Sequence, residues 1–394
     1  MDLIVAGQGV LFFTGTSFRL VNKDGDGLDV ELTPSCVHVK CIQSLEPLVD
    51  KNSTGLTGLE GAYYWFSLDS QNQMLYAGVG EARLETLIYK YKAENMLKFF
   101  ESITTIKTDM KIRLLKDPVT ATIPLLVKDT HHLTMHHIAS NKYMPKANLS
   151  PICQKLYDCI SGKKFILDDK DFPDFSKAIE RSITTPGLWC YKRLQEKSRE
   201  FNDNPNILET YLRITLNQNN GESPGIPYVM EIWPSGHYSP IHNHAGANAI
   251  IRVLHGKIHV KLFPFLCPNG TDISFAEADF NKDDITWISP TLNQTHQLMN
   301  VEKKSCITIQ CYMYDQNDKK HYDYFDYIGD DSETHQYTPD SDMDFLKFKQ
   351  LMKEEWTVRT GRPKIEICPG LEIKSPWFMN ILKRKKATNV STVM

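Results

Sequence analysis

The spacing of hydrophobic and polar residues divides the chain into a strand-rich beginning, a helical middle and a second strand-rich region. Over residues 1–100, short apolar or alternating runs are separated by turns rich in Gly, Asn and Asp, as in antiparallel strands. The runs expected to form strands are residues 10–13, 28–32, 36–42, 62–68, 74–79 and 84–91. The aromatic stretch 62–86 favours a hairpin in a sandwich-like core over a sugar-binding face.

Two patterns in the first 150 residues invite a metal-binding interpretation. Residues 23–27 (KDGDG) resemble the start of a calcium loop, but Leu28 stands where an EF-hand needs an oxygen ligand, so a hairpin turn is favoured. The run HHLTMHHIAS would place two histidines, His132 and His136, on one face of a helix. It lacks the order HExxH, so a polar linker over residues 126–150 is favoured over a zinc site.

Helical signals dominate the middle of the chain. Residues 93–102 predict a short helix, and residues 106–115 a return to strand. Ser150 followed by Pro151 predicts a helix over 151–160 that Gly162 ends. Apolar residues at 3–4 spacing predict a second helix over 172–182, and a weaker pattern predicts a third over 188–201.

A second strand pattern occupies residues 207–314. Its β-branched and aromatic residues alternate with polar ones, and six or more antiparallel strands of this length favour a jelly-roll-like double-sheet barrel that leaves no exposed edge. After Asp315 we expect ordered acidic and aromatic loops, then a helix over 343–356. The basic residues 383–386 favour a solvated terminus over a nuclear signal.

These patterns predict a mainly β protein with four segments. Residues 1–125 form a β-rich, sandwich-like domain of unknown role, and residues 126–150 a linker. Residues 151–350 form a double-stranded β-barrel preceded by short helices, and residues 351–394 a C-terminal helix and frayed tail.

Composition narrows the functional class. The net charge is −3, so no global field favours nucleic acid or an anionic membrane. No segment is long and apolar enough to span a bilayer, and the N-terminus lacks the basic start of a signal peptide. The 9 cysteines are scattered and never spaced as CxxC, which favours reduced thiols and a cytoplasmic location.

The most informative stretch is residues 233–256, WPSGHYSPIHNHAGANAIIRVLHG. In a strand, residues two apart point to the same side, so His242 and His244 could hold one metal ion if a third ligand joins them. His296, in the later segment WISPTLNQTHQLMN, is the candidate third ligand. Imidazoles suit Fe(II), Zn, Cu and Ni, so the ligand type alone does not choose the metal.

The spacing of these histidines resembles the two motifs of the cupin superfamily. The first motif places Gly236 and Gly256 around the histidine pair, and the second places Pro290 and Asn300 around His296. Most cupins add a Glu four or five residues after the second histidine; here those positions are Asn248 and Ala249. Within the superfamily, this three-histidine set resembles the cysteine dioxygenase (thiol dioxygenase) family over residues of about 150–320.

The resemblance implies roles for further residues. Arg213 matches the arginine that binds the substrate carboxylate in this family, Tyr211 the tyrosine two residues before it, and Trp233 a tryptophan of the pocket wall. Tyr312 can be aligned with the active-site tyrosine if one residue is deleted after Asn300. Gln310 stands where the family has a histidine, and Ala249 stands where some members have a cysteine linked to that tyrosine.

The resemblance therefore implies an Fe(II) enzyme that uses O2 to convert L-cysteine, or an analogue such as 3-mercaptopropionate, to the sulfinic acid. A site without a carboxylate ligand leaves the ion's positive charge for a substrate thiolate. The competing hypothesis is a non-catalytic or zinc-binding cupin that serves as an interaction module with the N-terminal β domain. A zinc cupin with isomerase activity is a weaker third hypothesis.

Overall fold

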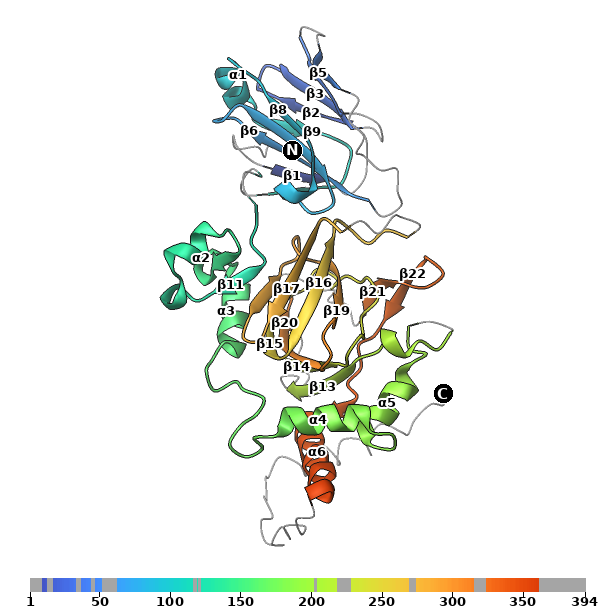
Figure 1. Cartoon of the computed structure of the whole chain (residues 1–394). Helices are drawn as coiled ribbons and strands as arrows, with labels where there is room; N and C mark the ends of the chain where they lie inside the picture. The colour runs from blue at the N-terminus through green and yellow to red at the C-terminus, as the bar shows by residue number, and fades with distance from the viewer. Residues whose placement is uncertain are drawn as a thin grey trace, which may run out of the picture. The chain divides into compact units, whose positions relative to one another are not determined.

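A computed structural model of the chain describes residues 9–12, 17–32, 37–43, 47–51, 62–115, 119, 122–201, 204–217, 228–268, 274–314 and 324–360. The chain divides into two compact units, Met1–Glu355 and Trp356–Met394. The sites discussed below all lie in the first unit, whose elements are labelled in Figure 1. The basic run at 383–386 lies outside the described residues.

Two five-stranded antiparallel sheets form the N-terminal region, with strand orders β10-β1-β6-β7-β8 and β5-β4-β3-β2-β9. Their strands are β1 (Gly9–Phe12), β2 (Ser17–Val21), β3 (Gly27–Leu32), β4 (Val37–Cys41), β5 (Pro47–Lys51), β6 (Tyr64–Asp69), β7 (Met74–Val79), β8 (Leu87–Lys92), β9 (Thr105–Lys107) and β10 (Ile112–Leu114). Leu28 and Val30 of one sheet share a buried core with Phe66 and Leu68 of the other. The expected β-rich, sandwich-like region is therefore present.

The hairpin prediction for residues 23–27 is confirmed. These residues lie in the turn between β2 and β3, which pair antiparallel from Ser17–Glu31 to Val21–Gly27. The Asn22 side chain accepts the backbone N–H groups of Asp24 and Asp26, each at 2.9 Å. Asn22 thus fixes the turn by a local hydrogen-bond pattern typical of this residue type.

The second β region consists of an eight-stranded sheet, β12-β11-β18-β15-β20-β14-β13-β23, and a three-stranded sheet, β17-β16-β19 (Figure 1). Its strands are β11 (Leu126–Lys128), β12 (Tyr143–Pro145), β13 (Leu212–Asn217), β14 (Tyr228–Trp233), β15 (Asn248–His255), β16 (Lys257–Phe263), β17 (Ala276–Asn281), β18 (Ile285–Ile288), β19 (Thr295–Met299), β20 (Cys306–Met313) and β23 (Met343–Asp344). Val253 of the larger sheet and Val260 and Leu298 of the smaller share one core. This is the double-sheet, jelly-roll-like barrel that the sequence predicts.

Residues 126–150 form part of the barrel sheet, so the description of this stretch as a linker needs correction. Leu126 of β11 pairs with Thr286 of β18, and β12 pairs with β11 in parallel. Two of the four histidines of this stretch lie on η2 (Thr130–His132) and two on α2 (Met135–Ala139), which the side chain of Thr134 caps. Among the described residues, they do not belong to a group of three or more potential metal ligands. Strands of three residues are too short to show a periodic pattern, and they form here because β11 pairs with β18 and β12 pairs with β11.

The helices before the barrel agree well with their sequence signals. Helix α3 (Pro151–Ile160) has the predicted bounds, and the Ser150 hydroxyl caps it by accepting the N–H of Cys153. The other helices are α1 (Leu97–Ser102), α4 (Phe175–Thr184), α5 (Trp189–Lys197) and α6 (Phe345–Thr360), with short 3-10 turns η1 (Leu84–Thr86), η3 (Lys146–Asn148) and η4 (Ile207–Glu209). Part of the segment expected as loops after Asp315 forms a hairpin of β21 (Phe325–Ile328) and β22 (Thr334–Tyr337).

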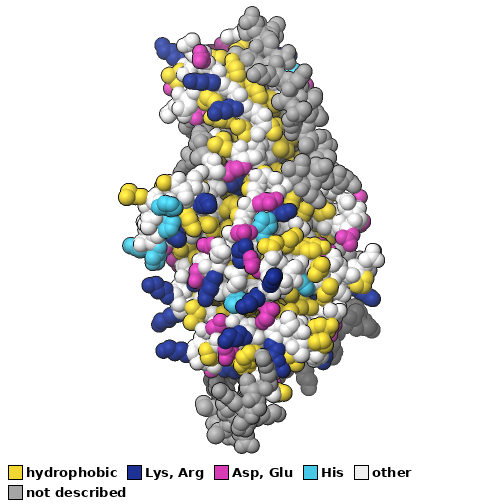
Figure 2. All heavy atoms as spheres, in the orientation of Figure 1, with side chains coloured by type: hydrophobic (Ala, Val, Ile, Leu, Met, Phe, Trp, Pro, Cys, Tyr) yellow, Lys and Arg dark blue, Asp and Glu magenta, His cyan; other side chains and the backbone are white. Residues whose placement is uncertain are grey.

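Charged side chains of both signs are present on one face of the molecule. In Figure 2, Lys and Arg side chains are interspersed with Asp and Glu side chains over the visible face, as the net charge of −3 leads one to expect. Among the described residues, the helices are all too short or too polar to cross a membrane.

Candidate metal centre

Three histidines meet inside the barrel. Potential ligand atoms of His242, His244 and His296 all lie within 4.8 Å of one another, and they are the one cluster of this kind in the described part of the chain. His296 lies on β19, and the backbone of His242 pairs with it through two hydrogen bonds of 3.0 Å. The Nε2 atoms of His244 and His296 are 3.1 Å apart, close to the separation of about 3 Å expected for two nitrogens bound to one ion at right angles.

The two histidines of the first motif do not lie in a regular strand, contrary to the expectation from their alternating pattern. His242 forms an isolated bridge with His296, and β15 begins only at Asn248. Ala245 and Gly246 have φ angles of 50° and 80°, which turn the chain between the motif and β15. This turn interrupts the strand while leaving both imidazoles directed at the same point.

Hydrogen bonds fix which ring nitrogens can bind a metal. Nδ1 of His242 lies 3.0 Å from the carbonyl oxygen of Pro240, and Nδ1 of His296 lies 3.2 Å from that of Asn293. Because a carbonyl oxygen can only accept, each Nδ1 carries the proton and each Nε2 presents its lone pair. Nδ1 of His244 is buried and has no hydrogen-bond partner among the described residues. The donor set therefore fits a metal ion.

Burial keeps these imidazoles neutral. It lowers the pKa of His242 to about 4 and that of His296 to about 3, with the neighbouring positive charges lowering it further. The pKa of His244 falls well below its ordinary value for the same reasons. Neutral imidazole is the form that binds a metal, so a divalent ion meets no competing proton at neutral pH.

The metal-free protein should lose stability as the pH falls. Because the pKa of His296 is about 3 in the folded chain and about 6.5 when unfolded, the unfolded state takes up the proton first. The contribution of neutral His296 to the free energy of unfolding is complete above pH 6.5. It is lost progressively below that pH, by about 2 kcal/mol at pH 5. Thermal denaturation of the metal-free protein at pH 7 and pH 5 measures this, and His296→Gln should show the smaller pH dependence. Equal dependence in both proteins would contradict the assignment.

No carboxylate completes the cluster in the described residues. At the positions where most cupins carry a Glu ligand, Asn248 directs its side-chain oxygen toward Cys153 Sγ of α3, at 3.5 Å, and Ala249 is fully buried. Ala249 pairs with Tyr312 across β15 and β20. The site therefore has three neutral ligands, and an ion bound there would keep its charge for an anionic ligand from outside.

Arg213 lies in the same interior but already has an acidic partner. It is directly opposite Glu231 across β13 and β14, and its Nη1 donates to Glu231 Oε1 at 2.5 Å. Both side chains are buried, and Nε of Arg213 has no hydrogen-bond partner among the described residues. Burial raises the pKa of Glu231, and the Arg213 charge opposes that rise. The pair therefore places one positive and one negative group beside the cluster.

Tyr211 and Trp233 form one wall of the site. Their rings stack with centroids 4.2 Å apart and an interplanar angle of 18°. Trp233 is fully buried, and burial raises the pKa of Tyr211 well above its ordinary value. Both residues line the same cavity as Arg213.

Tyr312 and Gln310 point to the same interior from β20. The ring of Tyr312 stacks on His244 with centroids 5.6 Å apart, and Arg213 lines the same cavity. Burial and Glu231 raise the pKa of Tyr312 well above its usual range, so the phenol keeps its proton. Gln310 lines the same cavity as Glu231 and Tyr312, and it acts to lower the pKa of the Glu231 carboxyl against the effect of burial.

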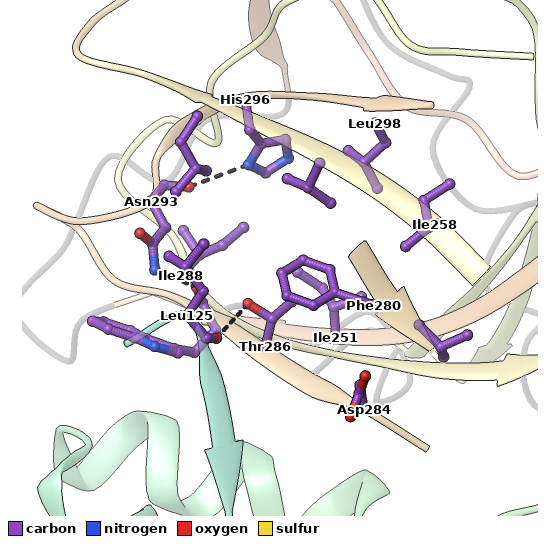
Figure 3. Close-up of a pocket in the computed structure, with 14 residues that line it drawn as sticks. Leu125, Ile251, Ile258, Phe280, Asp284, Thr286, Ile288, Asn293, His296 and Leu298 are labelled. Atoms are coloured by element: carbon purple, nitrogen blue, oxygen red, sulfur yellow. Dashed lines mark hydrogen bonds between the residues drawn. The ribbon is translucent and has the colours of Figure 1, made fainter. Parts of the chain in front are cut away.

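Two small cavities flank the cluster. The polar one has a volume of about 20 Å³ and is lined by the triad, the Arg213–Glu231 pair and the aromatic side chains, which is the room of about one water molecule. The second, of about 30 Å³, is mostly apolar. Figure 3 shows His296 at its edge, near Ile258, Phe280 and Leu298. Ile251, His296 and Leu298 line both cavities.

Glu231 and Phe325 are among the residues of this site that the sequence analysis does not predict. Glu231 is a charged residue within the otherwise apolar strand YVMEIW and shares a face with Trp233, which is a usable signal for a buried polar role. Phe325, whose ring lies 4.6 Å from that of His244, comes from β21, and its local sequence gives no comparable signal.

Comparisons with known proteins give partial likenesses. No family model matches the sequence. The Schizosaccharomyces pombe Cnp3 cupin domain is 15% identical over 27% of this chain and 65% of its own, with a TM-score of 0.22. An oxalate oxidase bound to the substrate analogue glycolate is 15% identical over 27% of this chain and 52% of its own, with a TM-score of 0.22. A protein with a double-stranded β-helix domain from Klebsiella pneumoniae is 15% identical over 33% of this chain and 85% of its own, with a TM-score of 0.21.

These neighbours include cupin-domain proteins. The chain spans about half to two thirds of the length of the first two. Sequence identity, coverage and TM-score are all too low for these likenesses to indicate an activity.

Proposed function

We propose that this protein is an Fe(II)-dependent thiol dioxygenase that converts L-cysteine and O2 to cysteine sulfinic acid. One observation carries the proposal: three neutral imidazoles converge without a carboxylate, beside a buried Arg213–Glu231 pair. His242, His244 and His296 would hold the ion, and Fe(II) bound there would supply the oxygen-activating chemistry of a site that leaves open positions. Both oxygen atoms pass to the sulfur, so O2 is the sole oxidant and no further reductant is needed.

The Arg213–Glu231 pair suits a zwitterionic substrate. Arg213 offers a planar fork for an α-carboxylate, while Glu231 offers an acceptor for an α-ammonium group. A thiol that carries only a carboxylate would meet the negative charge of Glu231, and a thiol that carries only an amine would meet Arg213. This arrangement favours cysteine over both 3-mercaptopropionate and cysteamine.

The remaining side chains orient the substrate and exclude water. The stacked rings of Tyr211 and Trp233 close one side of the site. The Tyr312 phenol keeps its proton at neutral pH, so it can donate a hydrogen bond to oxygen added to the sulfur. Gln310 lines the cavity together with Glu231, where its amide group can donate a hydrogen bond to a carboxylate.

Metal analysis and oxygen uptake test the proposal. The protein purified without added metal should contain iron, and after anaerobic loading with Fe(II) it should consume one O2 for each cysteine oxidised. Both oxygen atoms of the sulfinic acid should come from isotopically labelled O2, and cysteine should be preferred to 3-mercaptopropionate and cysteamine. Bound zinc with no oxygen uptake for any small thiol would instead support the interaction-module hypothesis.

A further inference from the structure

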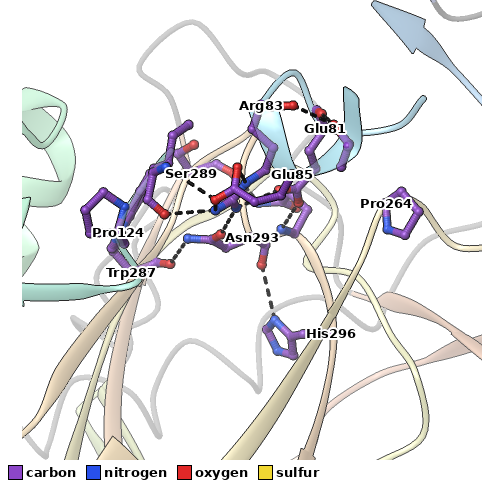
Figure 4. A network of polar contacts seen from close by, with 12 residues as sticks. Glu81, Arg83, Glu85, Pro124, Pro264, Trp287, Ser289, Asn293 and His296 are labelled. Atoms are coloured by element: carbon purple, nitrogen blue, oxygen red, sulfur yellow. Dashed lines mark hydrogen bonds and ion pairs between the residues drawn. The ribbon is translucent and has the colours of Figure 1, made fainter. Parts of the chain in front are cut away.

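A buried arginine of the N-terminal β region, Arg83, contacts the turn that leads into the candidate metal ligand His296. Arg83 lies in the turn between β7 and β8, and its side chain is inaccessible to solvent. Its Nη1 donates to the side-chain oxygen of Asn293 at 2.8 Å, although the two residues are 210 positions apart in the chain. Figure 4 shows this contact within a network of polar side chains.

The arginine is held from several sides. Glu85 accepts both Nε and Nη2 of Arg83, at 3.1 and 3.0 Å, and the carbonyl oxygen of Ile123 accepts Nη2 at 2.9 Å. The Phe275 ring lies against the guanidinium, 4.9 Å from centroid to Cζ. A side chain fixed at this many points has little freedom to move, so it holds Asn293 rigidly.

Asn293 connects Arg83 to the candidate metal ligand His296. Its φ angle is 60°, a left-handed conformation that Asn tolerates better than most residues. The Asn293 amide donates to the carbonyl oxygen of Trp287 at 2.9 Å, and its own carbonyl oxygen accepts Nδ1–H of His296 at 3.2 Å. Arg83 therefore supports the turn whose carbonyl oxygen selects the tautomer of His296 and orients its ring.

A second contact holds the next residue of the same turn. The Glu81 carboxylate, also fully buried, accepts the backbone N–H of Gln294 at 2.8 Å. Gln294 in turn joins the two motifs, because its side chain accepts Gly246 N–H at 3.0 Å and donates to the carbonyl oxygen of Ala247 at 2.9 Å. The turn before His296 is thus fixed by side chains of the N-terminal region at two successive residues.

We propose that Arg83 is a positioning residue for the metal ligand His296, so that the N-terminal β region is a structural part of the metal site. This inference rests on the histidine triad being a metal site, as in the proposed function, but not on which substrate is oxidised. Groups that orient a metal-bound histidine typically change metal affinity 10- to 100-fold when they are removed. Arg83→Met should lower the affinity by about that factor.

Cobalt binding tests the inference without using activity. Affinity of the full-length, metal-free protein for Co(II) would be measured by competition with a chromophoric chelator for wild type, Arg83→Met and Arg83→Lys. The lysine variant keeps the positive charge and one nitrogen that can donate hydrogen bonds. We therefore expect its Co(II) affinity to lie between those of wild type and Arg83→Met. Asn293→Gly is a milder variant, because it keeps the carbonyl oxygen and tolerates the positive φ but removes the contact with Arg83.

Arg252→Met is the matched control. Arg252 is another buried arginine that donates to the carbonyl oxygens of Ile160 and Gly162 and to Asp283, but its contacts do not lead to the triad. We expect it to lower thermal stability as Arg83→Met does while leaving Co(II) affinity within about twofold. In a His296→Gln background, Arg83→Met should weaken the residual binding no further, because the ligand that it positions is gone.

The results of these measurements distinguish the positioning role of Arg83 from the proposed thiol dioxygenase function. Equal Co(II) affinity in Arg83→Met and wild type, or an equal loss in Arg252→Met, would overturn the positioning role. A wild type that binds Co(II) but never oxidises a thiol would overturn the proposed function and leave Arg83 in its role. A folded wild type that binds no cobalt would overturn both.

Discussion

Replacement of His296 by glutamine is expected to lower the affinity for Fe(II) about 100-fold or more and to abolish oxygen uptake with cysteine. Removing a direct ligand should exceed the effect of removing the group that orients it. Glutamine fills a similar volume, and the two remaining imidazoles, His242 and His244, cannot hold the ion as a facial set of three. Metal content after dialysis and oxygen consumption measure the two effects.

His237→Gln is the control for this substitution. His237 is also buried, and its Nδ1 donates to the carbonyl oxygen of Thr210 at 2.8 Å, but it is not part of the ligand cluster. It should retain metal and activity while losing some stability. If both variants kept iron, or both lost it, His296 would have no special role as a ligand.

Much of the fold could be predicted because its signals are local. The start of α3 is set by Ser150 and Pro151, and the strands of the barrel show clear alternation or apolar runs. Elements that form through distant pairing were harder to find. Strand β5 begins with a proline and includes two charged residues, and β11 and β12 are three residues long. Such strands exist because a neighbouring strand pairs with them, which no short window of sequence records.

The candidate site also contains some residues that the local sequence predicts and others that only the structure reveals. The spacing of His242, His244 and His296 was sufficient to predict their convergence, which the structure shows. The placement of Arg213 beside them also agrees, but its buried partner Glu231 was not anticipated. Arg83 gave no signal at all, because its partner Asn293 lies 210 positions away. Contacts of this kind depend on how two folded regions meet, and they explain how a β region of unknown role can serve a metal centre.

Arg213→Met is expected to lower kcat/KM for cysteine at least 100-fold and to destabilise the fold by about 3–5 kcal/mol. The first effect follows from loss of the Arg213 guanidinium beside the triad, since a charge-assisted bidentate contact fixes the substrate carboxylate. The second follows because Glu231 would remain buried without its counter-charge. Steady-state kinetics and chemical denaturation measure the two effects separately.

The double variant Arg213→Met with Glu231→Gln distinguishes recognition from folding. It removes both charges at similar volume, so stability should return to within about 1 kcal/mol of wild type, as for other buried pairs replaced together. Activity with cysteine should stay low, because the carboxylate still has no partner, and the preference for cysteine over cysteamine should disappear. If the double variant regained cysteine activity along with stability, the pair would be a structural element of the barrel and the substrate carboxylate would bind elsewhere.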